Sequence, residues 1–421
     1  MRISPYSIGT GDRFGRQGRA QLAAVQKAAQ NGIGLDIVWN KSHREHLIVK
    51  TTPAQVRKEA DEAVSAMNWS GPYFTDADHI GMGNVDLFLE HSDFFTIDVA
   101  DYIGNKADGI SLSGFEKAFA HLKKSIRIPG LDKPIDITGD LFRAIAEKYL
   151  FAVQQAGVIY RHITKAKGGN AFITEISMDE TNDPQTPVEL LVILAAIAHE
   201  GIPVQTIAPK FYGRFNKGVD YIGDINRFAE EFEADILIAR YAAETLGLPD
   251  NLKLSIHSGS DKFRIYPVIG SLIRRHKTGI HLKTAGTTWL EELIGLAEAG
   301  GNALDMVKEI YDQSLSRYDE LCAPYLTVID IDKSALPAPG TVRGWHGPRL
   351  ANALRHRPDC PDYDINLRQL LHVGYKIAAE MGDDYLSALD ANRDIIAENV
   401  TNNLYKRHIA PLFLPEQISE E

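Results

Sequence analysis

Short apolar segments alternate with amphipathic segments along the first three quarters of the chain. Several apolar segments are hydrophobic almost throughout (LDIVW, FFTIDV, VQTIAP), which is typical of strands covered on both faces. The pattern predicts strands at residues 33–39, 47–51, 72–78, 94–98, 172–177, 204–209, 253–257, 279–283 and 326–329. It predicts helices at residues 15–31, 53–67, 113–125, 141–155, 187–200, 222–246, 266–276 and 288–299.

Strands that alternate with helices indicate an α/β fold with a parallel sheet. A number of strands close to eight favours a closed barrel over an open doubly wound sheet, although one of the nine candidates must then lie outside the barrel. After Asp332 the segment SALPAPGTVRGWHGPRL is typical of a loop, and the chain from Asn366 onward is almost wholly helical in pattern. We therefore expect a TIM-type (β/α)8 barrel over residues 1–332 and a C-terminal helical extension, residues 333–421, packed on it.

Composition excludes several classes of protein. The net charge of −11 disfavours nucleic-acid binding, and two cysteines outside any CxxC pair disfavour a disulfide framework or a cysteine-ligated zinc. The N-terminal residues have no apolar core of a signal peptide, and no apolar run approaches the roughly 18 residues of a membrane span. We expect a cytoplasmic enzyme with no membrane or nucleic-acid partner.

Ionisable side chains follow six of the predicted strands. In a barrel, the C-terminal ends of the strands and the loops after them form the active site. One such residue is more often a helix cap, but six groups that converge cannot lose water cheaply unless they pair with each other or with a metal. The residues are Asp76, Asp78 and His79; Asp98 and Asp101; Glu175, Asp179 and Glu180; Lys210 and Arg214; His257, Ser258, Ser260, Asp261 and Lys262; and His281, Lys283 and Thr284.

Three histidines lie on three different predicted strands. His79, His257 and His281 could converge on one divalent ion, with Asp220 or Glu175 as a carboxylate ligand. Imidazole and carboxylate together suit Zn, Mn, Ni, Co or Fe(II). No local HExxH or CxxC motif is present, so the spacing alone leaves the ligand set open. His281 precedes Lys283 by two residues and therefore shares its face, one layer deeper in the barrel.

Basic residues near the strand ends favour an anionic substrate. Lys210, Lys283, Arg214 and Lys262 could hold a carboxylate or phosphate, whereas a Schiff-base lysine is the alternative role. The segment AGTTW (285–289) supplies backbone N–H groups at a predicted helix N-terminus, which is suited to an anion. GTGDRFG (9–15) differs in spacing from a dinucleotide fingerprint, and we predict no strand before it, so a turn is an equally good interpretation.

Six segments together resemble the tagaturonate/fructuronate epimerase family. These are SIGTGDRFG, FTDADHIG, TEISMDET, IAPKF, IHSGSDKF and HLKTAGTTWLEE, and the resemblance covers about residues 5 to 410. The family interconverts two hexuronate-derived keto acids by epimerisation at C4. The resemblance implies an isomerase that uses one divalent metal, one acidic proton acceptor and one proton donor.

The resemblance also implies roles for individual residues. Asp78 is carried over as the base, His79 and His257 as metal ligands, and Glu175 as the proton donor. Asp220 and His281 compete for the remaining ligand position. Lys210, Lys283 or an arginine would bind the C6 carboxylate.

The chemistry of the substrate favours a retro-aldol route. In a 2-ketose, the C4 hydrogen is β to the ketone, so its removal gives no enolate. A carboxylate such as Asp78 would instead take the C4 hydroxyl proton, and the C3–C4 bond would break to an enediolate, stabilised by the metal, and an aldehyde. The aldehyde turns its other face, the bond re-forms, and Glu175 protonates the new alkoxide. The carboxylates need pKa values near neutral, which a buried multi-carboxylate site can supply.

Other functions remain open at this stage. A metal-dependent aldolase or ketose isomerase acting on a sugar acid or sugar phosphate would use the same ligands. Transient oxidation at C4 would need a tightly bound nicotinamide, for which we find no convincing fingerprint. A non-catalytic sugar-acid-binding protein would not need acid/base carboxylates beside histidines. The sequence is compatible with a homo-oligomer.

Overall fold

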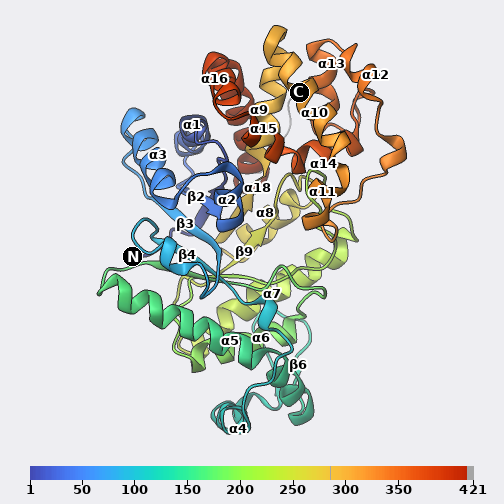
Figure 1. The fold of residues 1–421 in the computed structure, drawn as a ribbon. Coiled ribbons are helices and arrows are strands. Elements are labelled where there is room, and N and C mark those ends of the chain that lie inside the picture. The colour runs from blue at the N-terminus through green and yellow to red at the C-terminus, as the bar shows by residue number, and fades with distance from the viewer. Residues whose placement is uncertain (285, 415–421) are drawn as a thin grey trace.

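Eight parallel strands close into a barrel in a computed structural model that describes residues 1–284 and 286–414 (Figure 1). The order around the barrel is β1-β10-β9-β8-β7-β4-β3-β2, so β1 pairs with both β10 and β2. The strands are β1 (Tyr6–Thr10), β2 (Asp36–Ser42), β3 (Tyr73–Ile80), β4 (Phe94–Asp98), β7 (Ile173–Ser177), β8 (Thr206–Ala208), β9 (Lys253–His257) and β10 (Ile280–Thr284). The predicted (β/α)8 barrel with a helical C-terminal region is confirmed.

Helices cover the outside of the barrel. Their buried faces are apolar, as in α6, whose residues Leu190 to Ile197 are all buried. The barrel helices are α1 (Gly18–Gln30), α3 (Pro53–Ala66), α5 (Gly139–Lys167), α6 (Pro187–His199), α7 (Ile225–Thr245) and α8 (Tyr266–Arg275). An insertion before α5 contains α4 (Gly109–Ala118) and a hairpin of β5 (Ser125–Ile126) and β6 (Ile135–Asp136), which lies at the opposite end of the molecule from the C-terminal helices (Figure 1).

Two predicted strands are wrong. Residues 47–51 belong mainly to α2 (His43–Val49), because Ser42 and Glu45 form a capping box that starts a helix directly after β2. Residues 326–329 follow a 3₁₀ turn at Ala323–Tyr325 and lie outside the barrel.

The first strand of the barrel, β1, was not predicted from the sequence. YSIGT carries few β-branched residues, yet its segment Ser7 to Thr10 is buried between β2 and β10. GTGDRFG is therefore preceded by a strand, contrary to our expectation, and its first two residues, Gly9 and Thr10, belong to that strand. Tertiary burial of a small polar segment overrides its weak local signal.

A second hydrophobic core lies among the C-terminal helices. It contains Trp289, Ile310, Leu350 and Tyr385, and it also takes in Phe14 from the loop after β1. The helices of this region are α9 (Thr287–Ala299), α10 (Gly301–Ser316), α11 (Tyr318–Cys322), α12 (Pro339–Arg343), α13 (Gly347–Leu354), α14 (Ile365–Val373), α15 (Tyr375–Met381), α16 (Asp383–Ala391), α17 (Arg393–Asn402) and α18 (Ala410–Phe413), with a π-helical segment at Asn403–Ile409. This core starts before residue 332, and the domain division at that residue stays a prediction.

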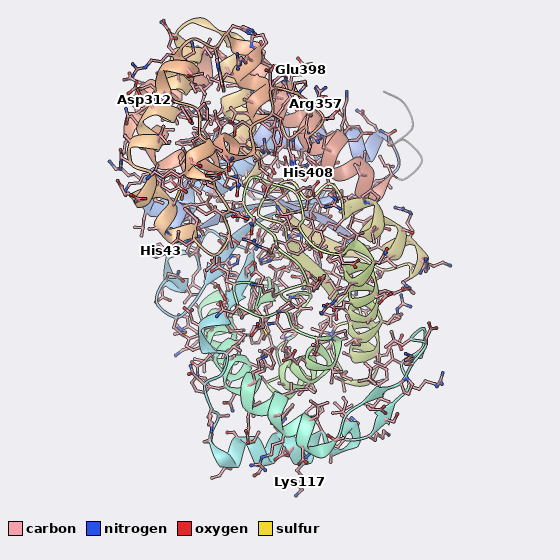
Figure 2. The ribbon with its side chains drawn as sticks, turned by 90° about the vertical axis from the view of Figure 1, so that its right-hand side faces the viewer. His43, Lys117, Asp312, Arg357, Glu398 and His408 are labelled. Atoms are coloured by element: carbon pink, nitrogen blue, oxygen red, sulfur yellow. The ribbon has the colours of Figure 1, made fainter. Side chains whose placement is uncertain are left out.

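A buried ion-pair network joins the helical region to the barrel. Arg368 Nη2 of α14 donates a hydrogen bond at 2.6 Å to Asp261 Oδ2, which lies in the loop after β9. Both side chains are fully buried. The rings of His356 and His408 lie 3.3 and 3.4 Å from the same carboxylate. Figure 2 shows His408 where the helical region meets the barrel, with Lys117 of α4 at the far end. Within the described residues, no helix is long and apolar enough to cross a membrane.

Replacement of Asp261 should weaken the attachment of the helical region to the barrel and lower the free energy of unfolding. Asp261→Ala leaves the buried Arg368 guanidinium without its counter-charge, so we expect a loss of about 3–5 kcal/mol in the free energy of unfolding. The matched control is Asp250→Ala, which removes an exposed ion pair with Arg2 and should cost only about 0–1 kcal/mol. Urea unfolding measures both changes, and equal losses in the two variants would contradict the role of Asp261.

Candidate active site

The interior of the barrel changes from apolar to charged along its axis. Val38, Phe74, Phe94 and Ile173 form a buried apolar cluster toward the N-terminal ends of the strands. Side chains two residues further along a strand lie on the same face, one layer higher. That spacing leads from Phe74 to Asp76, from Phe94 to Thr96 and from Ile173 to Glu175. The layer toward the C-terminal ends is therefore polar, although its residues are buried.

One ammonium group lies at the centre of this polar layer. Lys283 Nζ lies 2.8 Å from Asp76 Oδ2, 2.8 Å from Asp78 Oδ1 and 3.2 Å from Glu175 Oε1. It also donates to Thr96 Oγ1 at 2.8 Å. Because all these side chains are buried, Lys283 offsets much of the cost of placing several carboxylates in one cavity. The structure gives Lys283 a position among the carboxylates, whereas its predicted role was to hold the substrate.

The three carboxyl groups ionise differently. Burial raises the pKa of Asp76 to about 6, against the opposing effect of Lys283. For Asp78, burial also acts to raise the pKa, but Lys283 and His79 outweigh it and lower the pKa. Burial is likewise outweighed at Glu175, where Lys283 and His257 hold the pKa well below its usual range. The expected near-neutral pKa therefore occurs at Asp76, and Asp78 and Glu175 are ionised.

An irregularity in β3 brings two consecutive residues into the site. Neighbouring residues of a regular strand face opposite sides, so Asp78 and His79 could not both point inward. The pairing of β3 with β4 shifts register between Ala77 and Ile80, and His79 has a φ of 53°. Such a bulge re-aims a side chain, and a non-glycine residue in the left-handed region is held there only by its surroundings. The ring of His79 consequently reaches Asp78 Oδ1, at 2.8 Å from its Nδ1.

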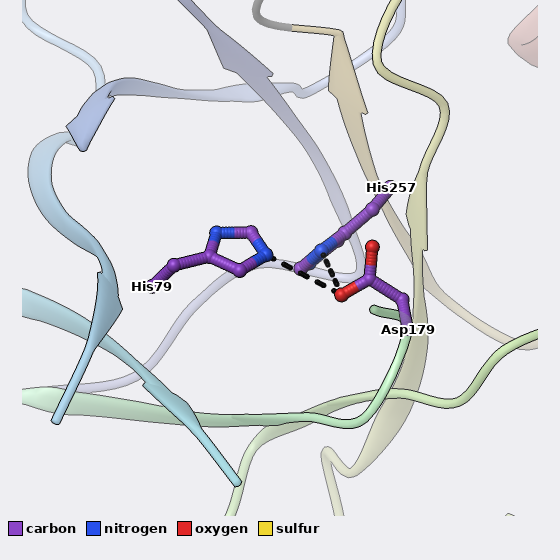
Figure 3. Close-up of side chains that lie close together, drawn as sticks. All are labelled: His79, Asp179 and His257. Carbon is purple, nitrogen blue, oxygen red and sulfur yellow. Dashed lines mark hydrogen bonds and ion pairs between the residues drawn. The ribbon is translucent and has the colours of Figure 1, made fainter. Parts of the chain in front are cut away.

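His79, Asp179 and His257 form a cluster with the donor set of a metal site (Figure 3). Asp179 Oδ1 lies 3.3 Å from His79 Nε2 and 3.1 Å from His257 Nδ1. One ligand atom from each residue lies within 4.8 Å of the others. His79 belongs to β3, Asp179 to the loop directly after β7 and His257 to the end of β9, so the barrel brings together residues that are far apart in the sequence. Asp179 is one of the predicted strand-end residues, but the ligand set predicted from the sequence does not include it.

The geometry of this cluster fits a divalent cation. His257 Nδ1 is buried and faces Asp179 Oδ1 at 3.1 Å, the ion-pair contact drawn in Figure 3. His257 Nε2 lies 2.8 Å from Glu175 Oε1. A carboxylate behind a ligating imidazole fixes the ring and its tautomer, and this is the usual arrangement of metal-bound histidines. Two imidazoles and a carboxylate suit the first-row metals predicted from the sequence.

The two residues that competed for the remaining ligand position lie outside this cluster. His281 is one layer below Lys283, where its Nδ1 lies 2.9 Å from Ser7 Oγ and its ring packs on Phe94. Asp220 Oδ1 accepts the backbone N–H groups of Tyr221 and Arg264. Their predicted metal roles stay untested, but the cluster of Figure 3 contains neither residue.

The other predicted substrate-binding cations are engaged elsewhere. Lys210 Nζ donates to the carbonyl of Thr181. Arg214 lies on the surface, 3.4 Å from Asp330. Lys262 is fully buried and donates to the carbonyls of Asn216, Val219 and Asp261. Of the predicted anion-binding segment AGTTW, Ala285 lies outside the described residues, and Thr287 begins α9.

A parallel eight-stranded barrel with carboxylate, histidine and lysine side chains gathered at the C-terminal strand ends is the architecture of a barrel enzyme. A family model described as UxaE, tagaturonate epimerase, matches residues 1–411. The chain therefore belongs to the tagaturonate epimerase family, whose members are isomerases.

Individual relatives agree with this assignment. The chain is 29% identical over 419 residues to the tagaturonate/fructuronate epimerase of Thermotoga maritima, and the match covers 96% of this chain and 80% of that protein. A glycerol-complexed crystal structure of the fructuronate-tagaturonate epimerase UxaE from Cohnella laeviribosi has a TM-score of 0.81 at 23% identity, covering 98% of this chain and 82% of that one. The native structure of the same protein has a TM-score of 0.80 at 24% identity, with the same two coverages. The fold is the same along nearly the whole chain.

Removal of the Lys283 charge should destabilise the protein in a pH-dependent way. The lowered pKa values of Asp78 and Glu175 contribute stability above the ordinary carboxyl pKa, and that contribution disappears as the pH falls through the lowered values. Lys283→Met removes the main attraction that lowers them, so we expect a loss of about 3–5 kcal/mol near neutral pH. At about pH 5 the variant can protonate its buried carboxylates, and the difference from wild type should shrink.

Urea unfolding near neutral pH and at about pH 5 tests this expectation. Lys58→Met is the matched control, because Lys58 is exposed and its pair with Glu62 is a surface contact. A Lys283 variant that loses the same stability at both pH values would show that the effect is one of packing and not of charge.

Proposed function

We propose that this protein interconverts tagaturonate and fructuronate at C4, and that it does so by metal-dependent retro-aldol cleavage of the C3–C4 bond. The observation that carries the proposal is the placement of Asp78 and Glu175 around the single ammonium of Lys283, beside the His79–Asp179–His257 cluster. Family membership supports the substrate pair, and the 29% identical relative bears the name of this reaction. The substrate is a small anionic sugar acid.

The cation site supplies the electrophile. A divalent ion held by His79, Asp179 and His257 would act as a Lewis acid that stabilises negative charge developing on the ketone oxygen. Glu175 orients His257 through its contact at 2.8 Å, and Asp78 orients His79 through a contact of the same length. Each proposed acid/base residue therefore also fixes the ring of one proposed ligand.

Asp78 is the proposed base. Its carboxylate lies at the C-terminal end of β3, and Lys283 and His79 lower its pKa against the effect of burial, so it is ionised and can accept a proton. The near-neutral pKa expected for the base occurs at Asp76 instead. Transfer of the C4 hydroxyl proton to Asp78 allows the C3–C4 bond to break. Its electron pair passes to the C1–C3 fragment as an enediolate, and C4 becomes an aldehyde on the fragment that carries the C6 carboxylate. No atom is lost in this step.

Glu175 is the proposed donor, and Lys283 explains how an ionised carboxylate can fill that role. Lys283 Nζ contacts both carboxylates, so it can give one of its own protons to Glu175 and take the proton received by Asp78, and it ends again as an ammonium. After the aldehyde has turned its other face, C3 attacks C4 and the new alkoxide takes the proton. Without this connection, the low pKa of Glu175 would leave it without a proton to donate.

Metal analysis separates the competing ligand sets. We expect the purified protein to contain a divalent metal, and we expect a chelator to abolish epimerisation until Mn²⁺, Zn²⁺ or Ni²⁺ is restored. Asp179→Ala should lower the metal content and reduce activity by more than about a hundredfold, since even outer-sphere changes cost 10–100-fold. Asp220→Ala and His281→Ala are the comparison variants and should keep the metal. Loss of metal in either of them, with retention in Asp179→Ala, would overturn the proposed ligand set.

Isotope labelling tests the bond that breaks. During turnover in D2O, the C4 position should take up no deuterium, because that hydrogen stays on carbon throughout a retro-aldol cycle. A substrate deuterated at C4 should likewise keep its label in the product. Deuterium appearing at C4 would exclude the mechanism, and accumulation of three-carbon fragments without the epimer would identify an aldolase instead.

A further inference from the structure

The substrate's carboxylate needs a cationic site that the polar layer cannot provide. Asp76, Asp78, Glu175 and Asp179 surround the proposed reaction centre, and Lys283 is already shared among three of them. The donors of Lys283 are already used by Asp76, Asp78, Glu175 and Thr96, so Lys283 has no free donor for a fifth carboxylate. If the proposed function is correct, on which this inference rests, the C6 carboxylate must therefore bind outside the layer, toward solvent.

Two cations from opposite walls of the barrel meet above the layer. Arg44 is the second residue of α2, directly after β2, and Lys217 lies in the segment between β8 and α7. In the closed barrel, β2 and β8 are separated by three strands in either direction, so they stand across the mouth from each other. Yet both cations contact the ring of Tyr325, with Arg44 Cζ at 5.2 Å and Lys217 Nζ at 5.4 Å from its centroid. Tyr325 therefore bridges the mouth of the barrel.

The helical region holds this bridge in place. Tyr325 Oη lies 3.2 Å from Tyr375 Oη, and Tyr375 in turn packs under Arg13, whose Cζ is 3.9 Å from the ring centroid. Arg13 donates to Glu45 Oε1 at 2.9 Å and to the carbonyl of His372 at 3.3 Å. α15, which begins at Tyr375, lies against α2 (Figure 1). Tyr325 and Tyr375, called here the tyrosine roof, cover the mouth of the barrel and are held by Arg13 and Glu45, which follow β1 and β2.

Arg44 and Lys217 remain free to bind an anion. Neither forms an ion pair with a carboxylate of the described residues, and their contacts are with the face of an aromatic ring. Arg44 is exposed and Lys217 is half-buried, so both can be reached from solvent. Burial acts to lower the pKa of Arg44, but Tyr325 and Glu180 outweigh it and raise the pKa, so the guanidinium is charged.

We infer that Arg44 and Lys217 bind the carboxylate end of the substrate beneath the tyrosine roof, and so select a sugar acid over the corresponding neutral ketose. The carboxylate would contact two cations that come from opposite walls of the barrel. These two contacts would fix the orientation of the carbon chain below it. Guanidinium and ammonium groups both form charge-assisted hydrogen bonds with carboxylates. Lys210, Arg214 and Lys262 are then not required for this purpose.

The test compares a charged with an uncharged ligand. Arg44→Met and Lys217→Met keep much of the side-chain volume but remove the charge. We expect each to raise KM for tagaturonate by about tenfold or more, the value of one charge-assisted hydrogen bond. The inhibition constant of tagatose, which carries a hydroxymethyl group in place of the carboxylate, should change by less than about twofold, because a neutral end group gains little from a cation. Lys58→Met serves as the surface-charge control and should leave both constants unaltered.

The outcomes separate this inference from the function on which it rests. A wild-type protein that does not epimerise tagaturonate would refute the proposed function itself. If the wild type is active, an unchanged KM in both variants would overturn the inference, and so would equal weakening of tagaturonate and tagatose, which indicates a structural role. A rise of KM in Arg214→Met but not in Lys217→Met would assign the carboxylate to the surface arginine.

Discussion

The charge of Lys283 is the constraint on which the rest of the site depends. Asp76, Asp78 and Glu175 lie in a buried layer of the barrel, and the cost of removing their charges from water would be prohibitive without a cation at their centre. By lowering the pKa of Asp78 and of Glu175, the same ammonium keeps both carboxylates ionised. Those carboxylates then hold the rings of His79 and His257, so the geometry of the proposed cation site follows from the electrostatics of the layer beneath it.

The barrel and the helical region make separate contributions to this arrangement. The barrel supplies the proposed acid/base groups and the proposed metal ligands from strand ends far apart in sequence. The helical region supplies Tyr325 and Tyr375 above the mouth, and it is attached through the buried pair of Asp261 and Arg368. A site built on strands and covered by a second packed unit would help to retain the intermediate of the proposed retro-aldol cleavage.

Much of the fold could be predicted because its signals are local. Apolar runs such as those ending at Asp98 and His257 were placed at their observed bounds, since buried parallel strands are hydrophobic throughout. β1 could not be found in this way, because YSIGT owes its burial to neighbours on both sides and not to its own composition. The strand predicted at residues 47–51 was wrong for the opposite reason. Their β-branched side chains favour a strand, but the capping box at Ser42 starts a helix before them.

The sequence by itself determined that ionisable groups would gather at the strand ends, because the position of a residue at the end of a buried strand is encoded locally. It also carried the family resemblance that the comparisons confirmed. Only the tertiary structure decided which of these groups meet. The bulge at His79 joined it to Asp179 and His257, while the depth of His281 and the backbone contacts of Asp220 left those two outside the cluster. Contacts between distant strands depend on register and on side-chain direction, and neither quantity is written in the spacing of residues along the chain.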